Sequence, residues 1–279
     1  MILAQEVNVM EETNKIYLCI DLKSFYASVE CVERGLDPFE VNLVVADPDR
    51  GGGAITLAAT PAIKKLGVPS RGRIYEIPDN IEYIIARPRM HLYMEYSAKI
   101  YSIFLKHIAP EDIHVYSIDE AFLDATPYLE LYGLTPKQLA RRILEDIYDE
   151  TGITATVGIG TNLFLTKVAL DITAKHTPDN MGFLDEELFK QQLWHHTPLT
   201  DIWMIGAGTA RHLAKLGIFD LYDLTQYPEW ILYKEFGINA EILIDHAWGK
   251  EPVEIKDIKA YKPTSNSISN SQIDYFAQK

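Results

Sequence analysis

The first third of the 279-residue chain alternates between strand-like and helix-like spacing of hydrophobic positions. Residues 15–21 (KIYLCID) are rich in β-branched and aromatic side chains and end on an acid, which is typical of a buried strand. Apolar residues then recur at helical spacing over residues 25–32, with Ser24 placed to cap the helix and Gly35 to end it. The pattern predicts a strand followed by an amphipathic helix.

A second unit follows, and then a long helix and a hairpin. Residues 43–47 (LVVAD) predict a strand, and residues 54–66 are rich in alanine, the residue with the highest helix propensity. Residues 89–107 carry one apolar stripe and predict an amphipathic helix. Residues 114–118 and 121–124 predict two strands of a hairpin, with an Asp-Glu pair at their junction.

The middle of the chain completes one sheet. A helix over 135–150, a strand over 154–159 and a helix over 162–175 capped by Asn162 are predicted. The order strand, helix, hairpin, helix, strand, helix is that of an α+β fold with a ferredoxin-like core. Residues 185–257 change to short helices separated by Gly and Pro, and the polar tail from residue 260 is typical of a linker or an unfinished domain.

Composition excludes several classes of protein. The chain has 47% hydrophobic residues and a formal charge of −14, which excludes a disordered or fibrous protein, and its length allows two or three domains. Residues 185–257 hold thirteen acids against six bases. This acidity argues against broad electrostatic attraction to nucleic acid or anionic membrane, so any role on DNA has to answer it.

The cysteines and the hydropathy predict a cytoplasmic protein with no membrane partner. Cys19 and Cys31 lack metal-type spacing, which makes a zinc site or a disulfide framework improbable. No run approaches 18 apolar residues, and the first residues lack a basic segment with a cleavage site.

Three acids carry the candidate chemistry. Asp21 ends the first strand, and Asp119 and Glu120 lie at the turn of the hairpin expected beside it. A single Asp in a turn is most often a cap, but three carboxylates at one sheet edge repel one another and need a divalent cation. Oxygen ligands of high charge favour Mg²⁺ or Mn²⁺, and two such ions promote phosphoryl transfer.

Three sequence stretches resemble a known family. CIDLKSFYASVE (residues 19–30), YSIDEAFLD (116–124) and TVGIGTNLFLTKVALDITAK (156–175) resemble the signatures of Y-family, UmuC/DinB-type translesion DNA polymerases. The stretch LAATPAIKKLGVPSRGRIYEIP is most similar to the UmuC-like branch of Gram-positive bacteria, plasmids and phages. The resemblance covers residues 14 to 260, in the family's order.

The resemblance implies a domain plan. A catalytic palm would comprise residues 1–36 and 78–180, with small fingers inserted at 37–77. Residues 181–258 would form a helical thumb that contains a helix-hairpin-helix, and residues 259–279 a linker and the start of a truncated little finger.

The resemblance also assigns the metal site. Asp21, Asp119 and Glu120 would be catalytic and would hold two Mg²⁺ ions, with Mn²⁺ as a substitute. The backbone carbonyl of Leu22 would be a further ligand, and Glu120 would help to activate the primer 3′-hydroxyl.

The nucleotide site is implied in the same way. Tyr26 would be the steric gate under the deoxyribose, with Phe25 beside it, and Lys64 and Lys175 would bind the triphosphate. Pro61 stands where many relatives have a Tyr that touches the triphosphate, and Thr60 would partly replace that contact. Without the motif, Tyr26 could as well be an ordinary core aromatic. A lysine beside another lysine, as Lys64 is, more often belongs to a solvated face.

Two further contacts are implied with DNA and with a partner protein. In residues 202–218, Gly206 and Gly208 would form the hairpin whose backbone N–H groups hold a DNA phosphate. Residues 272–276 (QIDYF) resemble short peptides that bind the sliding clamp, although so short a motif is more often an interrupted strand, here of the little finger.

The expected function is error-prone DNA synthesis past damage, from dNTPs on a primer-template. Two alternatives stay open. One is a catalytically silent DNA-binding or regulatory remnant of such a polymerase, and the other is a nucleotide cyclase, which also uses clustered acids and Mg²⁺ but does not predict a helix-hairpin-helix.

Overall fold

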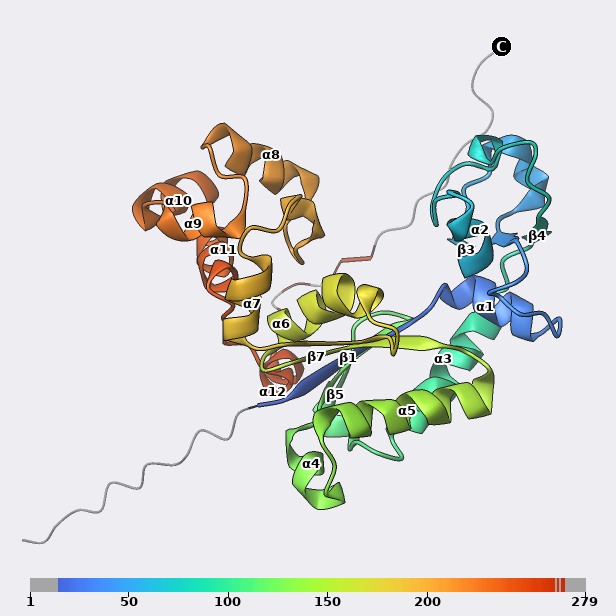
Figure 1. Ribbon diagram of the computed structural model, residues 1–279, viewed down its shortest axis with the longest axis horizontal. Helices are drawn as coiled ribbons and strands as arrows, with labels where there is room; N and C mark the ends of the chain where they lie inside the picture. The colour runs from blue at the N-terminus through green and yellow to red at the C-terminus, as the bar shows by residue number, and fades with distance from the viewer. Residues whose placement is uncertain (1–14, 264, 266, 269–279) are drawn as a thin grey trace, which may run out of the picture.

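A five-stranded sheet forms the centre of the computed structural model, which describes residues 15–263, 265 and 267–268 (Figure 1). Its strands, in spatial order, are β5 (Ile113–Val115), β6 (Glu120–Asp124), β1 (Tyr17–Leu22), β7 (Ala155–Gly160) and β8 (Met181–Leu184). The central strand β1 runs antiparallel to both β6 and β7, and β5 is antiparallel to β6. This order and these directions are those of a ferredoxin-like sheet, so the predicted α+β fold is confirmed.

The strand β8 extends that sheet beyond the predicted boundary. It pairs in parallel with β7, from Val157 opposite Met181 to Gly160 opposite Leu184. The predicted palm ends at residue 180, and these four residues fall in the predicted thumb. The sequence of this short strand has no alternating hydrophobic pattern, and its pairing with β7 becomes visible only in the folded structure. Local sequence therefore does not predict it.

Strand alternation gives the two faces of the sheet different characters. Leu18, Ile20 and Leu22 of β1 are buried in a large hydrophobic core with α3 (Met90–Phe104) and α5 (Pro136–Thr151). Tyr17 and Cys19 belong to a second cluster with residues of α6 (Leu163–Val168) and its continuation. Figure 1 shows α3 and α5 on one side of the sheet and α6 on the other.

Glycines let the chain after β7 lie close against the sheet. A Cβ atom at Gly158 would meet the backbone oxygen of Thr166 at 2.1 Å, and one at Gly182 would meet that of Ala169 at 2.5 Å. The predicted helix over 162–175 is not uniform: α6 passes into a π-helical segment (Ala169–Thr173) and a 3₁₀ turn (Ala174–His176). The Asn162 cap is confirmed, since its side-chain oxygen accepts a bond from the Leu165 N–H at 2.8 Å.

A small three-stranded sheet forms a separate unit beside α1 (Phe25–Val32). Its order is β3 (Ala58–Ala59), β2 (Leu43–Val45) and β4 (Ile84–Ala86), with the short helix α2 (Pro61–Lys65) and 3₁₀ turns at Pro48–Gly53 and Ile74–Glu76. Residues 54–66 do not form one helix despite their helix propensity, because pairing with β2 draws two of the alanines into a strand. The strand β4, which pairs in parallel with β2, extends this unit past the predicted limit at residue 77.

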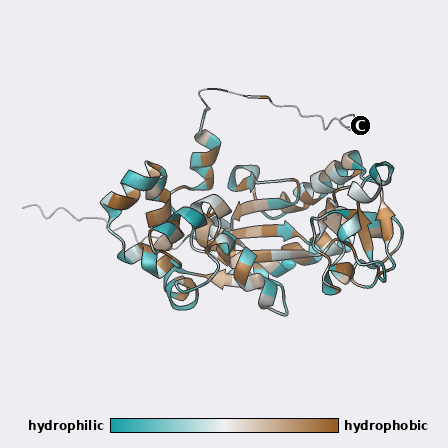
Figure 2. Cartoon of the chain, turned by 90° about the horizontal axis from the view of Figure 1, so that it is seen from above, coloured by the Kyte–Doolittle hydropathy of each residue, from teal (hydrophilic) through white to brown (hydrophobic). Residues whose placement is uncertain are grey.

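The alanines of this unit are all buried. Ala54, Ala58, Ala59 and Ala62 are each less than a tenth exposed, so their small size serves close packing within the unit. Figure 2 shows hydrophobic residues along the strands and alternating hydrophobic and hydrophilic positions along the helices.

Short helices make up the last part of the described chain, as expected, and all but the last of them share one core with residues of α6 and β8. They are α7 (Glu186–Leu193), α8 (Ala207–Lys215), α9 (Leu221–Gln226), α10 (Glu229–Phe236), α11 (Asn239–Ala247) and α12 (Ile255–Ala260). The predicted helix-hairpin-helix over 202–218 needs correction. That range holds only α8, and a single 3₁₀ turn, Leu199–Asp201, precedes it.

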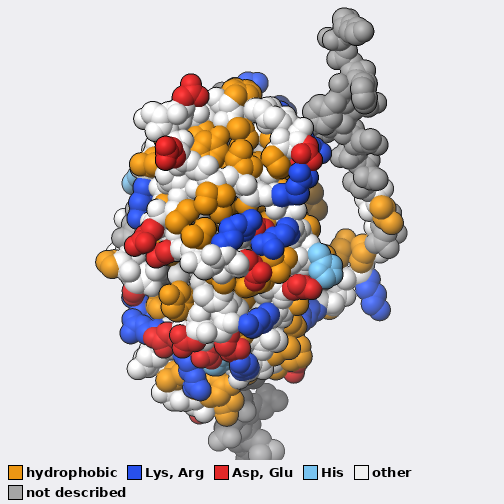
Figure 3. All heavy atoms as spheres, turned by 90° about the vertical axis from the view of Figure 1, so that its right-hand side faces the viewer, with side chains coloured by type: hydrophobic (Ala, Val, Ile, Leu, Met, Phe, Trp, Pro, Cys, Tyr) orange, Lys and Arg blue, Asp and Glu red, His pale blue; other side chains and the backbone are white. Residues whose placement is uncertain are grey.

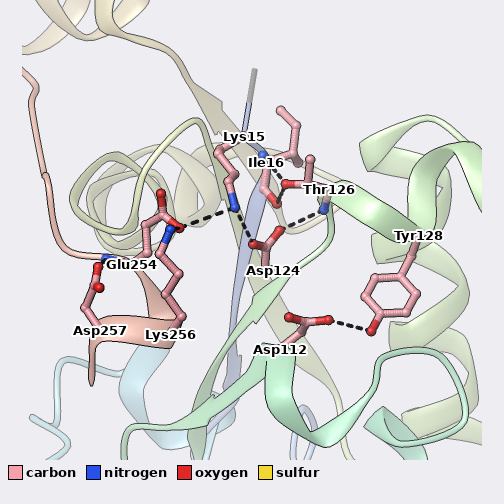
Figure 4. A network of polar contacts seen from close by, with 9 residues as sticks. All are labelled: Lys15, Ile16, Asp112, Asp124, Thr126, Tyr128, Glu254, Lys256 and Asp257. Atoms are coloured by element: carbon pink, nitrogen blue, oxygen red, sulfur yellow. Dashed lines mark hydrogen bonds and ion pairs between the residues drawn. The ribbon is translucent and has the colours of Figure 1, made fainter. Parts of the chain in front are cut away.

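The helix α12 returns to the sheet through an ion-pair network (Figure 4). Lys15 lies between Asp124 of β6 at 3.2 Å and Glu254 at 3.4 Å, and Lys256 bonds Glu254 at 2.8 Å. Asp124 also accepts a bond from the Thr126 N–H, at the start of α4 (Thr126–Tyr132). This network fixes the end of the helical unit against the edge of the sheet.

The clamp-like peptide at residues 272–276 lies outside the described residues. Within the described part of the chain, no helix combines the length and hydropathy that crossing a membrane requires.

Candidate active site

The three predicted acids meet at one end of the central sheet. Asp21 lies opposite Glu120 in the register of β1 and β6. The N–H of Leu22 donates to the carbonyl of Asp119 at 2.9 Å, which closes the turn of the hairpin against β1. Because directly paired residues of antiparallel strands point to the same face, Asp21 and Glu120 share the face covered by α6.

The charges at this edge act on one another. Burial, followed by the negative charges of Asp119 and Glu120, raises the pKa of Asp21 to about 7. The carboxylates therefore lie near enough to repel, and a divalent cation relieves such repulsion. Hard oxygen donors are also what Mg²⁺ prefers, so the donor set fits that ion.

Glu120 is held by partners that the sequence analysis did not single out. One of its oxygens, Oε1, accepts from Lys167 Nζ at 2.8 Å and from Cys19 Sγ at 3.1 Å. Asp119 accepts from the Ser117 hydroxyl at 2.7 Å. Among the residues that the structure describes, no group of three or more His, Cys, Asp or Glu side chains is placed to hold a metal ion as it stands. Oε1 of Glu120 is thus already bonded to Lys167 and Cys19.

Lys167 is a cation in direct contact with this edge. It comes from α6, also lies 3.2 Å from Asp171, and its side chain is only 10% exposed. Burial alone lowers the pKa of Lys167, but the hydrogen bond and charge of Glu120, together with Asp171, outweigh burial and raise it. Its signal in the sequence is its place in the TVGIGTNLFLTK stretch, one helix turn after the Asn162 cap.

The two predicted triphosphate ligands lie on the same side as the acids. Burial lowers the pKa of Lys64, Asp21 raises it, and Lys175 lowers it further, so all three charges are within electrostatic reach of one another. Lys64 Nζ donates to the Ser24 hydroxyl at 2.8 Å. Lys175 is exposed.

The expected capping role of Ser24 is wrong. Ser24 precedes α1 in the left-handed conformation, with φ 49° and ψ 42°, and makes no side-chain capping bond. Its hydroxyl instead accepts from Lys64, which links the helix α1 to the helix α2 across the site.

Thr60 does not reach the site in this structure. It is fully buried, and its hydroxyl donates to the Val41 carbonyl at 2.8 Å and accepts from the Leu43 N–H at 3.0 Å. Both partners belong to the small unit, so the expected replacement of a triphosphate contact by Thr60 is not supported by its position.

The predicted gate residue is stacked on a second aromatic ring. Tyr26 lies on Tyr93 of α3 with ring centroids 4.4 Å apart and planes 14° from parallel, and Phe25 is buried beside it. Tyr93 donates to the buried carboxylate of Glu30 at 2.7 Å, and Arg89 binds both oxygens of that carboxylate. Burial and the charge of Asp119 raise the pKa of Tyr26, which places its hydroxyl near the acids.

The predicted DNA-binding glycines lie at an open helix start. Gly206 precedes α8 with no side-chain cap, and a Cβ atom at Gly206 or Gly208 would meet nothing within 4 Å. Both glycines are exposed. The N–H groups of the first turn of α8 are therefore accessible to a ligand.

Comparison with known proteins agrees with this geometry. The model of the impB/mucB/samB family matches residues 20–171, which span the acids, the small unit and Lys167. The chain belongs to this family. The resemblance to UmuC/DinB-type Y-family polymerases is thereby confirmed.

Individual relatives support the same assignment. UvrX of Bacillus subtilis (strain 168) is 38% identical over 243 residues, which cover 86% of this chain and 57% of the relative. DNA polymerase IV 2 of the same organism is 34% identical over 259 residues, 92% of this chain and 60% of the relative. The solved insertion ternary complex of Dbh DNA polymerase is 30% identical with a TM-score of 0.72, covering 86% of this chain and 69% of that one. The chain thus spans less than two thirds of the length of these two curated relatives.

Proposed function

We propose that this chain is the catalytic part of an error-prone, translesion DNA polymerase that adds dNMPs to a primer 3′ end in damage tolerance and repair. The observation that carries the proposal is the edge where Asp21, Asp119 and Glu120 meet, inside the stretch that matches the family model. Relatives named DNA polymerase IV support the same reaction.

The domain roles follow from the two sheets and the helical unit. We assign the palm to residues 15–36 and 87–184, the fingers to 37–86 and the thumb to 185–258. These limits adjust the sequence-based ones for the strands β4 and β8. The chain after residue 258 keeps its proposed assignment to a linker and the start of a little finger.

Asp21, Asp119, Glu120 and the Leu22 carbonyl are proposed to hold the divalent ions, Mg²⁺ or Mn²⁺. When bound, such ions favour the deprotonated primer hydroxyl and neutralise the leaving pyrophosphate. Lys64 and Lys175, on the same side as the acids, bind the triphosphate and orient it. Tyr26, fixed against Tyr93, closes the space that a ribose 2′-hydroxyl needs.

The negative charge of the chain lowers its affinity for DNA, and backbone N–H groups that bind phosphate compensate for part of this loss. The open first turn of α8 at Gly206 and Gly208 binds a phosphate without a side-chain charge. Figure 3 shows basic side chains beside acidic ones on the end of the molecule that carries the fingers. We expect weak and distributive binding of primer-template DNA. A sliding clamp held through Gln272 and Phe276 remains a proposal, as does a cytoplasmic location.

Primer extension in Mg²⁺ tests the proposal. Asp119→Ala/Glu120→Ala is expected to lower extension by at least about a thousandfold, because the metal ligands act only together. Glu186→Ala/Glu187→Ala, which removes the same charge from the first turn of α7, is the matched control and should extend normally. Equal extension by both variants would exclude the acids as the catalytic site, and none by the parent chain while it binds DNA would favour the silent remnant.

The gate assignment has its own prediction. Tyr26→Ala should lower discrimination between dNTPs and rNTPs by about a hundredfold, because an open pocket no longer rejects the 2′-hydroxyl sterically. Incorporation of each nucleotide type, measured on the same template, decides this. Unchanged discrimination would leave Tyr26 as an ordinary core aromatic.

A further inference from the structure

A buried lysine that the proposed reaction does not use lies against the acid edge. Lys167 projects from α6, and its Nζ is 2.8 Å from Glu120 and 3.2 Å from Asp171. The side chains of Lys167 and Glu120 are each 10% exposed, so water screens their interaction little. Lys167 is fixed there by backbone packing, because Gly158 lets α6 lie directly on the sheet.

Glu120 is bonded to partners other than the two neighbouring acids. Its Oε1 accepts from both Lys167 and Cys19, which draws the carboxylate toward α6. Asp119 is meanwhile bonded to Ser117. A metal shared with Asp21 and Asp119 would therefore compete with Lys167 for Glu120. One carboxylate oxygen cannot bind the ammonium group and a metal ion at full strength at the same time.

We propose that Lys167 is an internal counter-ion that competes with divalent cations for Glu120. The proposal rests on the proposed function, since it concerns the same metal site, and it makes Lys167 a positioning residue. With no cation bound, the ammonium group offsets the repulsion among the carboxylates. When a cation binds, Glu120 turns to it, and Lys167 stays paired with Asp171.

Charge gives the direction of the effect. Lys167 stabilises the protein without metal, because removing one partner of a buried ion pair leaves the other charge uncompensated. The same positive charge repels an incoming divalent ion and has to release Glu120 first. Loss of Lys167 should thus weaken the folded protein and strengthen metal binding. A purely structural lysine would weaken both.

Mn²⁺ binding to the full chain without DNA measures this competition. The free ion is followed by electron paramagnetic resonance during titration, and melting temperature is recorded in EDTA. Lys167→Gln removes the charge and keeps an N–H donor on a slightly shorter side chain. Lys167→Arg keeps the charge, and Lys190→Gln removes a lysine from another same-helix ion pair, with Glu187.

We expect Mn²⁺ affinity and melting temperature to change in opposite directions. Lys167→Gln should bind Mn²⁺ on the order of tenfold more tightly and melt several degrees lower in EDTA. Lys167→Arg and Lys190→Gln should bind within twofold of the parent chain. In Glu120→Gln, which has no charge to compete for, replacing Lys167 by Gln should change the affinity much less.

Two results would overturn the proposal, and they are distinguishable. If Lys167→Gln binds Mn²⁺ equally or more weakly while Asp119→Ala abolishes binding, the metal site stands and the competition is refuted. If the parent chain binds no Mn²⁺ at all, the metal assignment fails, and the counter-ion role fails with it.

Discussion

The two faces of the central sheet come from alternate residues of the same strands, yet they differ in kind. On one face Leu18, Ile20 and Leu22 are buried against α3 and α5. On the other, Cys19 and Asp21 share their surroundings with Glu120 and with a lysine from α6. The apolar face stabilises the fold, and its rigidity lets the other face hold charges that repel one another. The acids lie at the ends of β1 and β6, on the face covered by α6.

The close contact between α6 and the sheet gives the largest expected effect. Gly158→Val should destabilise the protein by about 4 kcal/mol or more, because its Cβ would lie 2.1 Å from the Thr166 oxygen and the backbone has to shift. Thermal unfolding measures this. Gly206→Val, at a glycine with open space, is the comparison and should lower the melting temperature far less. Similar losses in the two variants would contradict the account of how Lys167 reaches the acids.

A substitution on the apolar face should separate stability from chemistry. Ile20→Ala leaves a cavity in the large core and should cost about 3 kcal/mol. Its neighbour Asp21 keeps the same backbone, so Mn²⁺ affinity of the folded protein should stay within about twofold. Chemical denaturation and Mn²⁺ titration together check this. A large loss of affinity would show that the two faces are not independent.

The charged face should show the smallest effect, and one that depends on pH. The pKa of Asp21 is raised to about 7 in the folded protein, from an ordinary value of 3.8, so ionisation is harder in the folded state. The parent chain therefore loses stability as pH rises from about 4 to about 7, and no more above that. In EDTA, Asp21→Asn should equal the parent near pH 4 and be about 2 kcal/mol more stable at pH 8, roughly half of what the pKa difference gives in full, because solvent reaches the partly exposed carboxylate. A constant difference across this range would contradict the burial and repulsion at Asp21.

The backbone of the site could be predicted from sequence. Asp21 follows an unmistakable strand and the Asp119-Glu120 pair interrupts a hairpin, so local patterns place all three acids. The partners of Glu120 could not be predicted, because they depend on register: Cys19 and Lys167 come from a neighbouring strand and from a helix 47 residues later.

The errors share one physical cause, which is that tertiary pairing overrides local preference. The alanines of residues 54–66 favour a helix on their own, but β2 pairs with two of them. Serine is a common N-cap residue, yet the Ser24 hydroxyl accepts a hydrogen bond from Lys64 instead of capping α1. The Thr60 hydroxyl is likewise bonded to Leu43 of the neighbouring strand. The strands β4 and β8 are short, and each is formed by pairing with a parallel strand that is distant in the sequence.

The central claim is that this acid edge joins a templated dNMP to a primer. Single-nucleotide incorporation in Mg²⁺ tests it most directly, with the lengthened primer and the released pyrophosphate measured in the same reaction. We predict one pyrophosphate for each nucleotide added, dependence on the templating base, and loss of both products in Asp21→Asn. Pyrophosphate released without primer lengthening would contradict the claim and indicate a cyclase reaction.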